Sequence, residues 1–124
     1  MIYKKSWKYI LKRVFDFYLQ LKAVKDFSDV KKGELGGYVD GYHNLSQKGN
    51  CWVYNNALVT DNAIVRDNAK VYGYAHVTGN SQVYDNAQVY DSAQVTGNAQ
   101  VFGFAMIRGD VNIKNEILSE GDYG

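Results

Sequence analysis

The sequence predicts an all-β chain that winds into a parallel β-helix with three strands in each coil. A six-residue phrase repeats without insertion from residue 53 to residue 117. Its first position is always Val or Ile, and its fifth is small or aliphatic. Similar residues also recur at every third phrase, as Tyr54, Tyr72 and Tyr90 do. A repeat of this kind predicts about four to five stacked coils.

Each phrase is expected to form one short strand followed by a tight corner. Ala69 at position five and Val71 at the next position one are separated by a single residue, so their side chains share one face of a strand. The residues between strands are mostly Asp-Asn, Gly-Asn or Gly-Tyr pairs, which include residues that tolerate a positive φ. Such a thin strip of Val and Ala is buried only when coils stack, about 4.8 Å apart.

The recurrence at every third phrase divides the outward side chains among three faces. Stacked aromatic and threonine side chains are favourable neighbours in a sheet, and like residues recur at every third phrase and not at every second. A duplication of a three-phrase unit would leave the same pattern. The position-two columns are Tyr54, Tyr72, Tyr90 and Arg108; Thr60, Thr78, Thr96 and Lys114; and Arg66, Tyr84 and Phe102.

Residues 1–34 are expected to form a basic cap over the first coil. The helical spacing of Trp7, Ile10 and Val14 predicts an amphipathic helix over residues 3–18. From Phe17 the apolar residues alternate, which suits a strand, and strand throughout is the alternative. A cap would protect an exposed strand edge, although the basic residues could instead contact a nucleic-acid backbone or a membrane surface. The predicted basic patch comprises Lys4, Lys5, Lys8, Lys12 and Arg13.

Three segments follow from this division: the cap and connector at 1–34, the β-helix at 35–118 and a tail at 119–124. Counting the phrase back from Val53 places Val39, Leu45 and Cys51 at position five. Cys51 is the single cysteine, so it is expected to be buried and inert. The sequence shows no signal peptide and no membrane-spanning stretch. A cytoplasmic location is therefore expected.

The phrase Val-x-x-x-Ala-x resembles the hexapeptide repeat of left-handed parallel β-helix proteins. The segment from Ala23 to Val39, followed by residues 44–54, resembles poorly characterised bacterial and phage members labelled provisionally as transferases. The resemblance covers about residues 23–117 and implies a left-handed coil. It does not identify a function, because this fold supports both enzymes and inert scaffolds.

The resemblance also suggests which chemistry to look for. Acyltransferases of this family use a histidine base beside a projecting loop, with acyl-coenzyme A between subunits. His43 lies in the irregular first turn and His76 faces outward, and residues 53–117 hold no inserted loop. The fold's zinc enzymes require three histidines, and the chain has two. The sequence therefore predicts no catalytic residue, metal or cofactor, and no enzymatic activity.

The tyrosine column is the predicted binding surface. Its flanking column contains Trp52, Lys70 and Met106, and this mixture of aromatic, Met and Arg side chains is typical of protein interfaces. The alternative is that an aromatic ladder merely stabilises the sheet. The predicted partner-binding residues are Tyr54, Tyr72, Tyr90, Arg108, Tyr84 and Phe102.

The leading hypothesis is a non-enzymatic protein that presents this flat aromatic face to a protein or nucleoprotein partner. Direct nucleic-acid binding is less favoured, and no membrane contact is expected. The phage-like relatives and the small size suggest a phage-encoded inhibitor of a host defence complex, such as an anti-CRISPR protein. A second copy could cover the last coil, and a dimer is favoured over a trimer. The alternatives are a trimeric acyltransferase and a structural or assembly module.

Overall fold

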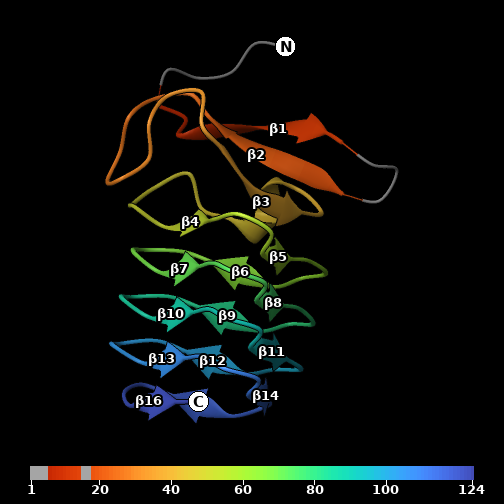
Figure 1. Ribbon diagram of the computed structural model, residues 1–124, viewed down its shortest axis with the longest axis vertical. Coiled ribbons are helices and arrows are strands. Elements are labelled where there is room, and N and C mark those ends of the chain that lie inside the picture. Colours follow the sequence, from red (N-terminus) through yellow and green to blue (C-terminus); the bar gives the residue numbers. More distant parts are fainter. Residues whose placement is uncertain (1–5, 15–17) are drawn as a thin grey trace.

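A computed structural model describes residues 6–14 and 18–124 of the chain. The chain forms a β-solenoid of about five stacked turns below an N-terminal cap (Figure 1). The predicted all-β class and the parallel β-helix are therefore confirmed. The main departure from β structure is the short 3₁₀ helix η1, Tyr42–Asn44, in the first turn.

Three sheets form the three sides of the solenoid. The seven-stranded sheet has the order β1 (Tyr9–Arg13), β2 (Leu19–Ala23), β3 (Leu35–Val39), β5 (Leu58–Val59), β8 (His76–Val77), β11 (Gln94–Thr96) and β14 (Asn112–Lys114). The five-stranded sheet contains β4 (Trp52–Val53), β7 (Lys70–Val71), β10 (Gln88–Val89), β13 (Met106–Ile107) and β16 (Asp122–Tyr123). The four-stranded sheet contains β6 (Ile64–Val65), β9 (Gln82–Val83), β12 (Gln100–Val101) and β15 (Ile117–Leu118).

The strand register confirms three strands in each coil. Val53 pairs with Val71, and Val71 with Val89, so each partner lies three phrases further along the chain. The pairing is parallel, as the stacking of successive coils requires. The Val and Ala columns point inward and are fully buried from Val53 to Ala105. This narrow core runs the length of the solenoid and exists only because neighbouring coils close it.

Position three of every phrase makes the corner. All the residues at this position, from Asn55 to Asn115, have φ between 56° and 68°, which favours Gly, Asn and Asp. Asp residues at these corners also connect the coils. The Asp85 carboxylate accepts a hydrogen bond from the Gly103 amide 3.1 Å away, and Asp67 accepts one from the Asp85 amide. The corner residues therefore set the bend and add a ladder of charge-assisted bonds.

The first turn departs from the predicted frame. Val39 pairs with Val59 and Leu45 bridges to Val65, so both positions are displaced by two from the register of the later coils. The extra length lies between Leu45 and Cys51. The expected burial of Val39, Leu45 and Cys51 is confirmed, but the frame counted back from Val53 is wrong before Cys51.

The last turn also departs from the predicted six-residue frame. Ile117 pairs with Gln100, one position short of the regular register, so its side chain points outward and is 68% exposed. Leu118 pairs with Val101 in its place. The unbroken phrase therefore ends at Ile113. The segment expected as a tail contributes β16, which pairs with β13.

The prediction of an N-terminal helix is wrong for the part of residues 3–18 that the structure describes. β1 and β2 are antiparallel strands, and β2 pairs with β3, so the cap extends the seven-stranded sheet. Tyr9 and Leu21 are buried under this sheet. Consecutive apolar residues in β1 point to opposite faces of the strand. Their spacing in the sequence therefore resembles that of an amphipathic helix. The alternating pattern that favoured a strand from Phe17 matches β2.

Polar side chains complete the contact between cap and first coil. β4 is an edge strand of its sheet, so no coil above can donate to its carbonyl groups. The Lys8 Nζ donates to the Cys51 carbonyl at 2.6 Å, and the Tyr9 hydroxyl donates to the Leu45 carbonyl at 2.5 Å. The Gln47 Oε1 accepts from the Lys8 amide at 2.7 Å. The Lys8 and Tyr9 side chains therefore supply donors that another coil would otherwise supply, and the Gln47 bond joins the cap backbone to the first turn.

No helix among the described residues is long and apolar enough to cross a membrane.

The corner geometry yields a stability prediction. Asp85→Ala removes the bond to Gly103 and places an alanine at φ 56°. We expect a loss of about 2 kcal/mol in the free energy of unfolding. Asp85→Gly should lose less, because glycine adopts this φ freely, and Asp85→Asn should lose least. Urea unfolding measures all three, and equal losses for Ala and Gly would contradict the role of backbone conformation.

Candidate functional site

The outer side of the five-stranded sheet carries the strongest candidate site, here called the tyrosine face. It is defined by the position-two column Tyr54, Tyr72, Tyr90 and Arg108 with the neighbouring Lys70, Gln88 and Met106. Parallel register holds Lys70, Gln88 and Met106 in line, so the tyrosines and the arginine that follow them also align. The regular coil spacing therefore brings together side chains that are three phrases apart in the sequence.

Stacked rings form the centre of the tyrosine face. The rings of Tyr72 and Tyr90 are parallel, with 1° between their planes and 4.7 Å between their centroids. The Tyr72 hydroxyl donates to Gln88 Oε1 at 2.7 Å. Such a pair is rigid and keeps an apolar ring partly exposed to solvent.

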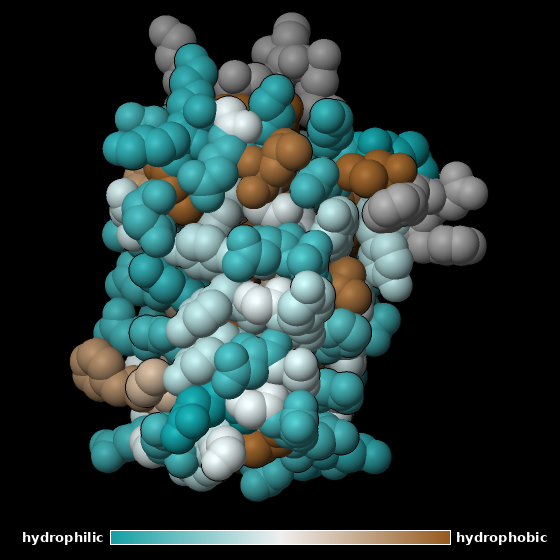
Figure 2. All heavy atoms as spheres, viewed as in Figure 1, coloured by the Kyte–Doolittle hydropathy of each residue, from teal (hydrophilic) through white to brown (hydrophobic). Residues whose placement is uncertain are grey.

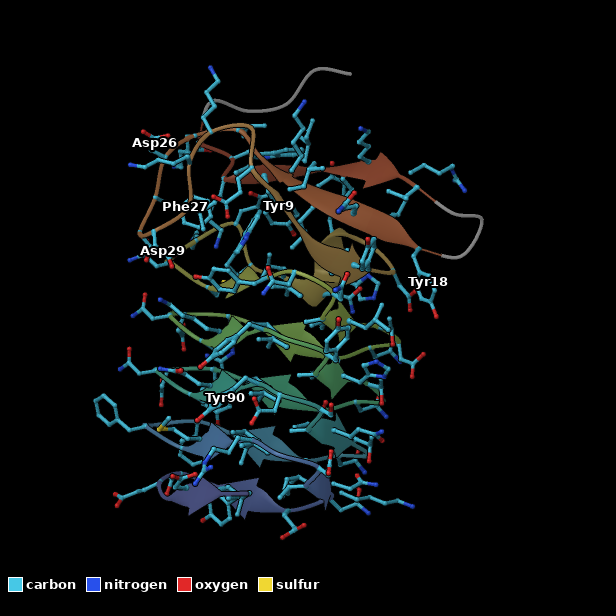
Figure 3. The ribbon with its side chains drawn as sticks, in the orientation of Figure 1. Tyr9, Tyr18, Asp26, Phe27, Asp29 and Tyr90 are labelled. Atoms are coloured by element: carbon cyan, nitrogen blue, oxygen red, sulfur yellow. The ribbon has the colours of Figure 1, made fainter. Side chains whose placement is uncertain are left out.

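Tyr54 interrupts the stack. Its ring stands at 82° to that of Tyr72, with 6.2 Å between the centroids. The reason is a bond from the Tyr54 hydroxyl to Asp29 Oδ1 at 2.8 Å. Burial, and then the neighbouring Asp29 carboxylate, raises the pKa of the Tyr54 phenol. Figure 3 shows Asp29 on the cap loop beside the first coil, with Tyr90 lower on the solenoid.

A pocket lies where the cap meets the tyrosine face. Its volume is about 280 Å³. Lys70 Nζ lies 6.0 Å from the centroid of the Tyr54 ring, so a cation, a carboxylate and two aromatic rings meet here. The lining residues are Asp29, Tyr54, Asn55, Lys70, Tyr72 and Gln88. Nothing in the sequence indicated that Asp29 belongs to this site, because Asp29 is a loop residue outside the repeat.

Arg108 closes the other end of the column. Its Nε lies 2.6 Å from Asp122 Oδ1 on β16, and this bond lowers the pKa of Asp122. Both groups are exposed to solvent, so the pair positions the guanidinium more than it stabilises the fold.

The six predicted binding residues lie on two sides of the solenoid, as their columns in the sequence predict. Tyr84 and Phe102 project from the four-stranded sheet, where their rings stack with centroids 5.0 Å apart. The Arg66 guanidinium covers the other side of Tyr84, 4.0 Å from its centroid. Trp52 was expected beside the tyrosines, but it is buried under Phe27 and Tyr9 of the cap.

Large exposed aromatics lie elsewhere on the corners. Tyr74 is 66% exposed and Phe104 is 74% exposed. Both occupy position four of the phrase, at the corner between strands, and neither is among the predicted binding residues. In the view of Figure 2, hydrophobic side chains are scattered over a mainly hydrophilic surface.

Fewer residues of the predicted basic patch are exposed in the structure than the sequence predicts. Lys8 is 1% exposed and belongs to the contact between cap and coil, so its assignment to an exposed patch is wrong. Burial lowers the pKa of Lys8 and raises the pKa of the neighbouring Cys51. Lys12 and Arg13 are exposed on β1. Lys4 and Lys5 lie outside the described residues.

The histidines are separate from the tyrosine face. His43 Nε2 lies 2.7 Å from the Asp61 carbonyl oxygen and must carry a proton to donate there. Its Nδ1 is then the nitrogen that could accept a proton. His76 projects from β8 on the seven-stranded sheet. Within residues 6–14 and 18–124, no group of three or more His, Cys, Asp or Glu side chains is placed to hold a metal ion.

Comparison with known proteins supports the hexapeptide repeat. No protein-family profile matches the chain. An Escherichia coli (strain K12) protein named uncharacterized acetyltransferase YdcK is 48% identical over 40 residues. The match spans 32% of this chain and 12% of the length of that relative. The repeat and the solenoid together fit the left-handed β-helix hexapeptide-repeat proteins.

This similarity corrects one expectation from the sequence. The chain was predicted to have no enzymatic activity, because it lacks a recognisable catalytic constellation. The matched relative is named as an acetyltransferase, which contradicts that prediction.

The environment of Tyr54 gives a pH prediction. In the unfolded chain its pKa is near 10.0, and in the folded chain it is higher. As pH rises above 10.0, the unfolded state loses a proton that the folded state keeps, so stability falls. Tyr54→Phe should make this fall less steep, and Asp29→Asn should do so to a smaller extent. Urea unfolding between about pH 9 and 11 measures the slopes, and an unchanged slope in Tyr54→Phe would contradict the assignment.

Proposed function

Taking the chain as a hexapeptide-repeat β-helix, we propose that it binds a protein or nucleoprotein partner through the tyrosine face. The observation that carries this proposal is the rigid Tyr72–Tyr90 stack beside a pocket with mixed charge. Aromatic side chains held in fixed positions bind at low entropic cost and dominate many interfaces. Inhibition of a host defence complex would be one use of such a surface, and it stays a prediction.

Acyl transfer is the second candidate, favoured by the similarity to a protein named as an acetyltransferase. His43 is the better-oriented base, because the Asp61 carbonyl holds its Nε2 and leaves Nδ1 to accept a proton. The tyrosine face and His43 lie on different parts of the coil, so partner binding and acyl transfer are compatible. Light scattering would distinguish a trimer from a dimer.

The first proposal predicts loss of a partner in a face-specific variant. Tyr72→Ala combined with Tyr90→Ala should lower partner recovery from host lysate at least about tenfold, because central aromatic residues contribute most of the affinity. Thr78→Ala combined with Thr96→Ala changes the seven-stranded sheet and is the matched control. Quantitative mass spectrometry of the captured proteins gives the comparison. Equal recovery by the wild type and both variants would contradict this proposal.

The second proposal predicts binding of an acyl donor. Acetyl-coenzyme A should release heat in calorimetry and raise the melting temperature. If the chain transfers the acetyl group, His43→Gln should lower the rate about a hundredfold, as loss of a general base does. His76→Gln is the control and should retain activity. Absence of both heat and thermal shift would exclude the acyltransferase.

A further inference from the structure

The tyrosine stack ends abruptly at Tyr72. Tyr90 covers one side of the Tyr72 ring at 4.7 Å, in parallel. On the other side Tyr54 is turned by 82° and its centroid is 6.2 Å away. Tyr54 therefore does not cover Tyr72 in the way that Tyr72 and Tyr90 cover each other. The bond from Tyr54 to Asp29 holds this break open.

The four-stranded sheet shows what completes an equivalent stack. Tyr84 donates to Gln100 just as Tyr72 donates to Gln88, and the two bonds have the same separation along the chain. Phe102 covers one side of Tyr84, as Tyr90 covers Tyr72. The Arg66 guanidinium covers the other side at 4.0 Å.

Arg66 also has a carboxylate partner in this arrangement. Its Nη1 lies 3.2 Å from Asp67 Oδ2, so the guanidinium combines a ring contact with an ion pair. The tyrosine face has the equivalent ring in Tyr72. Asn55 stands at the chain position that corresponds to Asp67, and the carboxylate at this pocket comes instead from Asp29 of the cap loop. The tyrosine face has Tyr54 where the other sheet has Arg66, so the guanidinium is absent.

The pocket of about 280 Å³ lies beside Tyr54 and Tyr72, where the guanidinium is absent. Asp29 uses one oxygen to accept from Tyr54, and a carboxylate has capacity for further donors. Gln88 and Asn55 add amide groups to the wall. The pocket is therefore an aromatic surface with an acceptor at its rim.

We propose that this pocket takes the planar guanidinium group of an arginine side chain from a protein partner. The inference rests on the proposed function of the tyrosine face as a protein-binding surface. The guanidinium would stack on Tyr72 and donate to Asp29, as Arg66 stacks on Tyr84 and donates to Asp67.

The chemistry favours arginine over other ligands. A lysine ammonium is not planar and cannot both stack on the ring and present a fork of donors. A nucleotide base could also stack on Tyr72, and Lys70 would then attract its phosphate while Asp29 would repel it. The positive charge of Lys70 repels any cationic ligand and limits its affinity. Removing this charge should therefore strengthen arginine binding.

The test is an NMR titration of the full chain with Nα-acetyl-arginine methylamide. Shifts should appear at the Tyr72 ring and the Gln88 side-chain amide. The citrulline derivative, which has the same shape without the charge, should bind about tenfold more weakly. The lysine derivative should also bind more weakly, because it cannot stack.

Three variants separate the contributions. Asp29→Asn should weaken arginine binding about tenfold. Lys70→Gln should tighten it about threefold, because a repelling charge is removed. Asp110→Asn changes an exposed carboxylate on a corner beyond β13 and should have no effect. For a nucleotide ligand, Lys70→Gln should have the opposite effect, and adenosine monophosphate is the probe for that case.

Several results would overturn the proposal. These are equal binding of the arginine and lysine derivatives, an unaffected Asp29→Asn variant, or no shift at Tyr72 with about 50 mM arginine derivative. Shifts at Tyr72 with adenosine monophosphate alone would assign the pocket to nucleotides. If arginine fails to bind while Tyr72→Ala with Tyr90→Ala still loses the partner, only the arginine pocket is wrong. If arginine binds while the double variant keeps the partner, the proposed function is wrong.

Discussion

Parallel hydrogen bonding between successive coils is the constraint on which the rest of the structure depends. The Tyr54 amide donates to the Val71 carbonyl at 2.8 Å, and the Tyr72 amide donates to the Val89 carbonyl at 3.0 Å. A two-residue strand is too short to stand alone, so each coil is stable only through its neighbours. The same bonds fix which side chains stack. The buried Val column and the exposed tyrosine column therefore have one cause.

This constraint makes the first coil the difficult part of the fold. Its edge carbonyl groups have no coil above them, and the cap supplies donors from Lys8 and Tyr9 instead. The loop that follows β2 brings Phe27 onto Trp52 and Asp29 onto Tyr54. The cap thus protects the edge and also shapes the end of the tyrosine face. The candidate pocket lies where the regular solenoid meets this irregular cover.

The regular coils and the irregular first turn contribute different features to the candidate sites. The central coils repeat one arrangement, which gives stiffness but little chemical variety. The regular coils supply the Tyr72–Tyr90 stack, and the irregular first turn and its cap supply the Asp29 pocket and His43. The similarity to a protein named as an acetyltransferase covers 40 residues, so it supports the repeat more strongly than any particular reaction.

The sequence by itself determined the coil, its three sides, the buried Val and Ala columns and the alignment of Tyr54, Tyr72 and Tyr90. These follow from a local period, because every phrase has the same environment and coil spacing is set by the backbone. Tertiary structure alone decided that the cap is made of strands, that Lys8 and Trp52 are buried, and that Tyr54 turns toward Asp29. Those outcomes depend on single contacts between residues far apart in the chain, and such contacts leave no periodic signal.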